Sequence, residues 1–281
     1  MKKLALFALS ALATAAMAAG PVSPSAIIIS GSSNQTASLN SSNFSNRSNA
    51  HNTAMQNVSS NAGNISIRGN SDQTTTSRGA TVNNESVDAN DFANQNISSN
   101  AGKVTITMSG NSTQESMLVD SEIMNKATGG GATAVQNLAS NNGKDIVISS
   151  SSNQTAMAIN GAVVANTAEN NNATALQNLA SNNGTGIQIR GTSEQTATVD
   201  GGSVYNWANG NSARATQNLS SNFGNVTISG SSVQSTHMVG GMMTNVAMGR
   251  NSHAIQNIAS NDACNEPVVD PCPNGCSSNG R

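Results

Sequence analysis

Side-chain amides recur along this chain at a fixed spacing, and amides can hydrogen-bond to copies of themselves. Each Gln or Asn amide offers two N–H donors and a carbonyl acceptor with two lone pairs. Two Gln series and one Asn series repeat at intervals of about 40 residues, a period typical of repeat architectures. The first Gln series is Gln35, Gln73, Gln114, Gln154, Gln195 and Gln234, and the second is Gln56, Gln95, Gln136, Gln177, Gln217 and Gln256. The Asn series, which closes each repeat, is Asn61, Asn100, Asn141, Asn182, Asn222 and Asn261.

Catalysis and metal binding find little support in the residue pattern. The three histidines, His51, His237 and His253, do not form a ligand spacing such as H-x-x-x-H. Asp and Glu are scattered singly, whereas general acid–base catalysis needs clustered groups. Tyr205 and Trp207 share one face of a predicted strand, but other repeats lack such a pair, which favours packing over sugar binding. We therefore expect no enzymatic activity, no metal and no cofactor.

All three cysteines, Cys264, Cys272 and Cys276, lie in the last part of the sequence. Prolines there remove backbone donors, so this tail cannot extend a strand ladder. In an oxidising compartment, an odd number of cysteines predicts one disulfide within the tail and one free or intermolecular thiol.

Extended strands must position the amides. In residues 187–199, and again in residues 215–221, small, aliphatic and amide residues alternate with period two and so share one face of a strand. Gly and Asn clusters such as Asn160-Gly161 mark corners between short strands. The pattern predicts an all-β fold, a repeat β-solenoid of stacked cross-β rungs with about six copies of a ~40-residue unit. It leaves open whether one copy forms one large rung or two small ones.

The composition bears on whether the chain is ordered or disordered and on which classes of partner we expect. Aromatic residues make up 2% and charged residues 9% of the chain. Such a chain is either disordered or a stacked β-structure with amide ladders. The strict alternation favours stacking, and low charge fits because stacked identical charges repel. The net charge of −2 gives no electrostatic reason to expect nucleic acid as a partner, and no stretch after the N-terminal segment is long enough for membrane insertion.

Four segments follow from these patterns. Residues 1–18 resemble a cleaved secretion signal, with Lys2 and Lys3 before an apolar run and the sequence Ala16-Met17-Ala18 at its end. Residues 19–26 form a short N-terminal segment, residues 27–262 the six-copy repeat domain, and residues 263–281 the Cys- and Pro-containing tail. We therefore expect an extracellular or cell-surface protein that is exported through the periplasm.

Two stretches resemble known bacterial fibre subunits. Gly210, Asn211, Ala213 and Gln217 match the spacing of the curlin repeat, G-x-G-N-x-A-x-x-x-Q, although Ala208 replaces its first Gly. The segment 221–230, which is followed by a Gln of the first series, is similar to repeats of Fap-type fibre subunits. Those subunits also end in a Cys pair.

The resemblance implies a functional-amyloid subunit of a biofilm matrix that polymerises with itself. It also implies an outer-membrane secretion pore, a chaperone and a nucleator subunit as partners. The function we expect is a secreted structural subunit that forms amyloid-like fibres for adhesion and biofilm. The alternatives are a monomeric β-solenoid adhesin, a glycan- or ice-binding solenoid and a disordered matrix protein.

Overall fold

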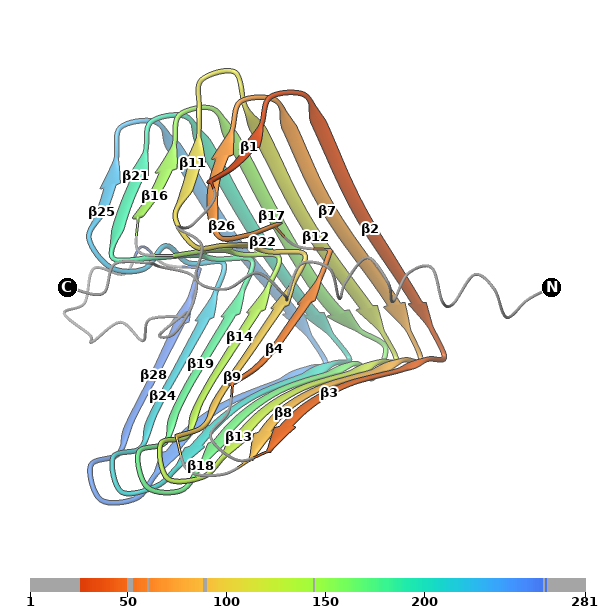
Figure 1. The fold of residues 1–281 in the computed structure, drawn as a ribbon, viewed down its shortest axis with the longest axis vertical. Coiled ribbons are helices and arrows are strands. Elements are labelled where there is room, and N and C mark those ends of the chain that lie inside the picture. The colour runs from red at the N-terminus through yellow and green to blue at the C-terminus, as the bar shows by residue number, and fades with distance from the viewer. Residues whose placement is uncertain are drawn as a thin grey trace.

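The computed structural model describes residues 26–49, 53–59, 61–87, 90–143, 145–259 and 261. The expected signal segment, the tail and its three cysteines lie outside these residues. All regular elements of the described residues are β-strands, stacked in parallel into a solenoid (Figure 1). The predicted all-β repeat solenoid is therefore confirmed.

Four six-stranded parallel sheets form the walls of the solenoid, and each takes one strand from every repeat. Sheet 1 contains β1 (Ala26–Ile29), β6 (Asn64–Ile67), β11 (Val104–Ile106), β16 (Asp145–Ile148), β21 (Gly186–Ile189) and β25 (Val226–Ile228). Sheet 2 contains β2 (Ser32–Asn40), β7 (Asn70–Arg78), β12 (Asn111–Val119), β17 (Ser151–Ile159), β22 (Thr192–Asp200) and β26 (Ser231–Val239). Sheet 3 contains β3 (Asn43–Asn49), β8 (Thr81–Val87), β13 (Glu122–Thr128), β18 (Val163–Glu169), β23 (Ser203–Asn209) and β27 (Met242–Met248). Sheet 4 contains β4 (Thr53–Val58), β9 (Phe92–Ile97), β14 (Thr133–Leu138), β19 (Thr174–Leu179), β24 (Arg214–Leu219) and β28 (His253–Ile258).

Short strands also pair at the corner between sheet 4 and sheet 1. They are β5 (Asn61–Ala62) with β10 (Asn100–Ala101), and β15 (Asn141–Asn142) with β20 (Asn182–Asn183).

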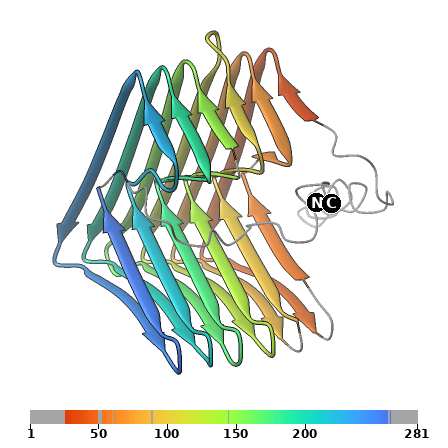
Figure 2. The same cartoon turned by 90° about the vertical axis from the view of Figure 1, so that its left-hand side faces the viewer.

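Each repeat makes one large rung. The register aligns Gln73 with Gln35 in sheet 2 and Gln95 with Gln56 in sheet 4, so both halves of a repeat stack on the same halves of the next. Figure 2 shows the strands of successive repeats side by side along the solenoid axis. The structure thus settles the question that the sequence left open. We call the strands β1 to β4 the first rung and β25 to β28 the last rung.

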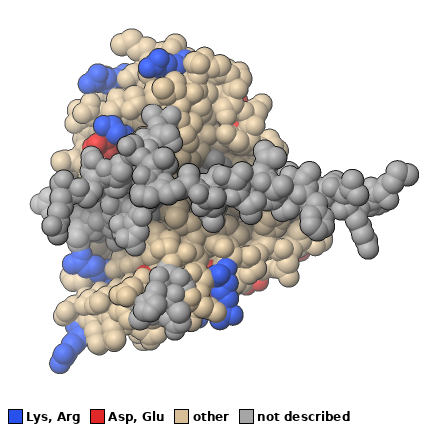
Figure 3. Space-filling view, in the orientation of Figure 1, with Lys and Arg blue, Asp and Glu red and all other residues tan. Residues whose placement is uncertain are grey.

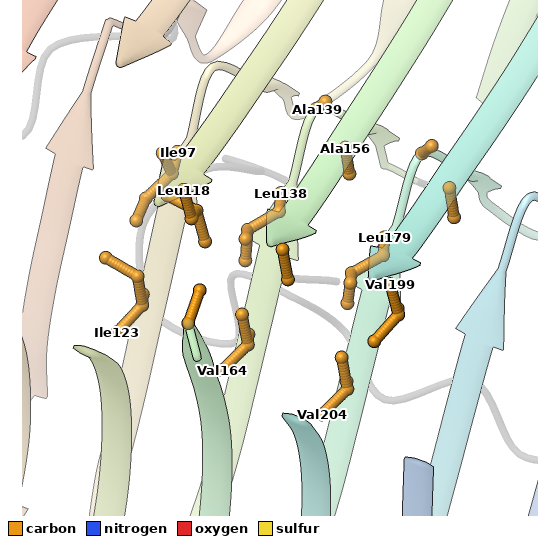
Figure 4. Packing of buried hydrophobic residues seen from close by; sticks show 14 of the residues in the cluster. Ile97, Leu118, Ile123, Leu138, Ala139, Ala156, Val164, Leu179, Val199 and Val204 are labelled. Atoms are coloured by element: carbon orange, nitrogen blue, oxygen red, sulfur yellow. The ribbon is translucent and has the colours of Figure 1, made fainter. Parts of the chain in front are cut away.

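Alternating side chains fill the interior with three apolar groups. Sheet 1 contributes columns of Ile and Val, such as Ile106 and Ile148. A second group joins Leu118 of sheet 2, Ile123 of sheet 3 and Leu138 of sheet 4, which point toward one another (Figure 4). A third group contains only Ala and packs sheets 3 and 4 closely together. Strands with small or aliphatic inward residues therefore build thin layers rather than one thick core.

A strained corner follows every strand of sheet 4. Ala139 and Ala180 have φ angles of 48° and 50°, and a left-handed residue recurs at this position in each repeat. The bend turns the following Asn into the interior. A close approach comes next, since a Cβ on Gly143 would lie 1.6 Å from the carbonyl oxygen of Gly102. Only Gly fits this point of the stack.

Candidate functional site: interior amide ladders and open end rungs

The first Gln series forms a continuous ladder along the inside of sheet 2. Nε2 of each Gln donates to Oε1 of the Gln one rung earlier. The distances are 3.0 Å for Gln73 to Gln35, 3.0 Å for Gln114 to Gln73, 3.1 Å for Gln154 to Gln114, 3.0 Å for Gln195 to Gln154 and 3.1 Å for Gln234 to Gln195. Gln73, Gln114, Gln154 and Gln195 are almost fully buried. Buried amides need such partners, because an unsatisfied one costs about 1–3 kcal/mol.

The closing Asn series forms a second ladder beside the first. Nδ2 of Asn141 donates to Oδ1 of Asn100 at 2.7 Å, and Nδ2 of Asn182 donates to Oδ1 of Asn141 at 2.7 Å. The two ladders are cross-linked, since Nε2 of Gln154 also donates to Oδ1 of Asn141 at 3.1 Å. One amide hydrogen of Gln154 thus forms a hydrogen bond along the solenoid axis, and the other forms a hydrogen bond across the interior.

The second Gln series forms a ladder on the inside of sheet 4. Nε2 donates to Oε1 one rung earlier at 2.8 Å for Gln95 to Gln56, 2.9 Å for Gln136 to Gln95, 2.8 Å for Gln177 to Gln136, 2.7 Å for Gln217 to Gln177 and 2.6 Å for Gln256 to Gln217. The same amide reaches sheet 3, because Nε2 of Gln177 also donates to the main-chain oxygen of Tyr205 at 3.0 Å.

Sequence reasoning missed an Asn ladder on the inside of sheet 3. Nδ2 donates to Oδ1 of the Asn one rung later, at 2.8 Å in every step: Asn46 to Asn84, Asn84 to Asn125, Asn125 to Asn166, Asn166 to Asn206 and Asn206 to Asn245. Nδ2 of Asn166 also donates to the main-chain oxygen of Leu176 in sheet 4 at 3.0 Å. Sheets 3 and 4 are therefore joined by reciprocal amide-to-backbone bonds.

A further missed ladder lies on the opposite side of sheet 4. Its Asn residues directly follow the second Gln series, and Nδ2 of Asn137 donates to Oδ1 of Asn96 at 2.8 Å. Its other members are Asn57, Asn178, Asn218 and Asn257. The signal was present as a Gln-Asn dipeptide in every repeat. The second position was overlooked because it falls on the outer side of a strand.

Charged side chains stay outside these ladders. Asp91, at the corner before β9, is the one buried charged residue of the described ranges. Others lie scattered over a surface that uncharged residues dominate (Figure 3). Three pairs place opposite charges in adjacent rungs: Arg47 with Glu85 at 3.3 Å, Lys103 with Asp145 at 3.6 Å and Lys126 with Glu169 at 3.0 Å.

The last rung at several positions, and the first rung at Phe44, expose apolar side chains in columns that the middle rungs bury. Phe44 in the first rung is 45% exposed, whereas Val82, its partner in the second rung, is 0% exposed. Ile258 in the last rung is 41% exposed, whereas Leu219 beside it is 0% exposed. Ile228 and Met238 show the same contrast. Both end rungs also present a strand edge without a described neighbour.

The histidines and the other residues considered for catalysis or metal binding do not lie close together. His237 and His253 are exposed on sheets 2 and 4, and His51 lies outside the described residues. Within the described ranges no three His, Cys, Asp or Glu side chains come together as a metal site. The same ranges contain no helix with the length and apolarity that a membrane span requires. Comparison with known proteins gave no matching family model, curated protein or solved structure.

Proposed function

We propose that this chain is a secreted structural subunit that polymerises into extracellular amyloid-like fibres for adhesion and biofilm formation. The observation that carries the proposal is the contrast between rungs. Inward positions of the end rungs are apolar and 39–49% exposed at Ile228, Phe44, Ile258 and Met238. An exposed apolar surface beside open strand edges is a template for another chain.

The amide ladders support the same function. Each ladder repeats one type of amide hydrogen bond along the solenoid axis. A rung added at an end therefore extends the ladders with hydrogen bonds of the same type. Stacked amides of this kind are a hallmark of cross-β assemblies. An outer-membrane pore, a chaperone and a nucleating subunit belong to this proposal as partners, and the predicted export signal in residues 1–18 supports the location.

Assembly of the purified chain from about Ala19 onward tests the proposal. Fibres should form, and their diffraction should show the cross-β spacings of ~4.7 Å and ~10 Å. A chain that stays monomeric at tens of micromolar for days, with β-sheet circular dichroism, would contradict fibre formation.

A second candidate function is a monomeric adhesin that binds a glycan. Tyr205 and Trp207 favour it, because both side chains lie on the outer side of β23, two residues apart. The chain has one Trp, so its fluorescence reports on this position alone. A saturable fluorescence change with a soluble glycan, in a sample that forms no fibres, would favour the adhesin.

A further inference from the structure

The ladders have a direction. In the two Gln ladders and the closing Asn ladder, the amide nitrogen donates toward the N-terminal end of the solenoid, as in Gln114 to Gln73, Gln136 to Gln95 and Asn141 to Asn100. The ladder inside sheet 3 runs the other way, since Nδ2 of Asn125 donates to Oδ1 of the next Asn along the chain. The two ends of the molecule therefore differ in hydrogen-bonding character.

The first rung offers donors at two positions and an acceptor at a third. Gln35 and Gln56 have no described rung before them to which their amide nitrogens could donate, and Nε2 of Gln35 contacts Ser33 of its own strand at 2.9 Å. Gln73, one rung later, makes the equivalent bond to Ser71 and still donates to Gln35. In the sheet 3 ladder, Nδ2 of Asn46 donates to Asn84, so Oδ1 of Asn46 is the terminal hydrogen-bond acceptor.

The last rung offers the complement. Oε1 of Gln234 and of Gln256 are the accepting ends of their ladders. Nδ2 of Asn245 donates to the main-chain oxygens of Ala215 and Ile255. Asn206 makes the same two kinds of bond and also donates along its ladder, so Asn245 has the geometry to do likewise.

We propose that a second copy of this chain binds head to tail, with its first rung stacked in register on the last rung of the preceding copy. This inference rests on the proposed function and specifies its interface. Gln35 and Gln56 donate to Gln234 and Gln256 of the preceding copy, and Asn245 of that copy donates to Asn46. The two Gln ladders and the sheet 3 Asn ladder then continue unbroken through the junction.

Apolar and charged positions fit the same register. Continuing the observed pairing places Ile228 against Ile29 and Met243 against Phe44, both in columns that are buried in the middle rungs. Among Lys, Arg, Asp and Glu, the described part of the first rung contains Arg47 alone and that of the last rung contains Arg250 alone. Arg47 falls opposite Val246, four residues before Arg250, so like charges are not stacked.

A head-to-head contact lacks this complementarity. Two first rungs would bring the Gln35 and Gln56 donors of both copies to one junction, and two last rungs would bring acceptors to acceptors. Such an isologous contact also closes on itself as a dimer, whereas a head-to-tail contact repeats without end. A polar filament is therefore the assembly that the ladder directions favour.

Variants blocked at one end test the inference on the full mature chain. The first-rung variant is Gln35→Lys with Gln56→Lys, and the last-rung variant is Gln234→Lys with Gln256→Lys. Neither variant alone should form fibres, and each should sediment at monomer mass. An equimolar mixture should form a species of twice that mass, because the intact last rung of one variant meets the intact first rung of the other.

The result that overturns the inference is a homodimer of each variant alone with no new species on mixing, while the unmodified chain still forms fibres. Absence of fibres from the unmodified chain instead overturns the proposed function. Should the Gln variants fail to fold, Phe44→Lys and Met238→Lys replace them, since both positions are already half exposed in the monomer. The same outcomes then apply.

Discussion

The middle rungs and the end rungs share one side-chain pattern but differ in what covers it. In the middle, each Gln lies between two others, as Gln154 lies between Gln114 and Gln195. At the ends, Gln35 and Gln234 each have one such neighbour. In solenoids, stability is approximately a sum of terms for each repeat and each interface between repeats. A rung is therefore complete only when it has two neighbours.

The largest effect is expected from charge in the middle of a ladder. Gln136→Lys with Gln177→Lys would place two adjacent ammonium groups where both side chains are fully buried. An uncompensated buried charge costs about 3–5 kcal/mol. Two such charges should therefore offset much of the free energy of unfolding of an ordinary domain, which is about 5–15 kcal/mol. Circular dichroism should show loss of the folded solenoid, and fibres should not form.

The matched control is Asn171→Lys with Asn172→Lys, at an exposed corner of the repeat that contains Gln177. Its free energy of unfolding should change by no more than about 0.5 kcal/mol. Equal damage from both double variants would contradict the interior position of the second Gln series.

Gly143→Ala should give the next largest effect. Its Cβ would lie 1.6 Å from the Gly102 oxygen, and the backbone of two rungs must separate to make room. Overpacking of this kind costs about 3 kcal/mol. Urea denaturation followed by Trp207 fluorescence measures the loss. Gly31→Ala is the end-rung control, because no atom lies within 4 Å of the added Cβ, and a similar loss there would remove the distinction between middle and end.

Removal of a single amide should lower the stability more in a middle rung than in an end rung. Gln154→Met keeps the side-chain length but removes the axial donor to Oε1 of Gln114 and one of the donors to Oδ1 of Asn141. The free energy of unfolding should fall by about 2 kcal/mol. Gln234→Met in the last rung should lower it by less than about 1 kcal/mol, because the site is partly exposed. Fibre elongation, followed by an amyloid dye, should slow for both variants. Equal losses of monomer stability in the two variants would contradict the difference between middle rungs and end rungs.

The smallest effect is expected on the outer surface. Glu169→Gln removes the ion pair with Lys126, whose side chains are 34% and 40% exposed. Such pairs contribute about 0.2–1 kcal/mol and are screened by salt. The difference in urea midpoint between this variant and the unmodified chain should shrink in high salt. A difference that salt leaves unchanged would mean that the pair acts through packing.

Much of this arrangement was predictable from the period of the sequence. Gln73 and Gln114 recur about 40 residues apart on an alternating strand, and parallel stacking then brings identical residues together. The sheet 3 ladder was hidden because Asn is so abundant that Asn125 does not stand out from its neighbours. The direction of each ladder could not be read either, since it depends on which carbonyl lies within reach of each amide. Gln177, for example, is oriented by the main-chain oxygen of Tyr205, which is distant in sequence.

The number of rungs in each repeat was also beyond the sequence. The two halves of a repeat look alike because both place a Gln after small residues on an alternating strand. Their surroundings differ, however, since Gln154 faces Asn141 whereas Gln177 faces the backbone of sheet 3. Only the pairing of strands shows that the halves lie in different walls of one rung.

The axial rise per subunit in the fibre, measured by cryo-electron microscopy, distinguishes stacked six-rung solenoids from flat single-layer subunits. Six parallel rungs at a strand spacing of ~4.8 Å predict one chain for about every 29 Å of fibre. The ~4.8 Å layer line should persist through each junction, because the ladders continue from copy to copy. A rise of ~4.8 Å per chain would mean that each molecule contributes a single flat layer. That result would contradict the solenoid subunit and its head-to-tail stacking.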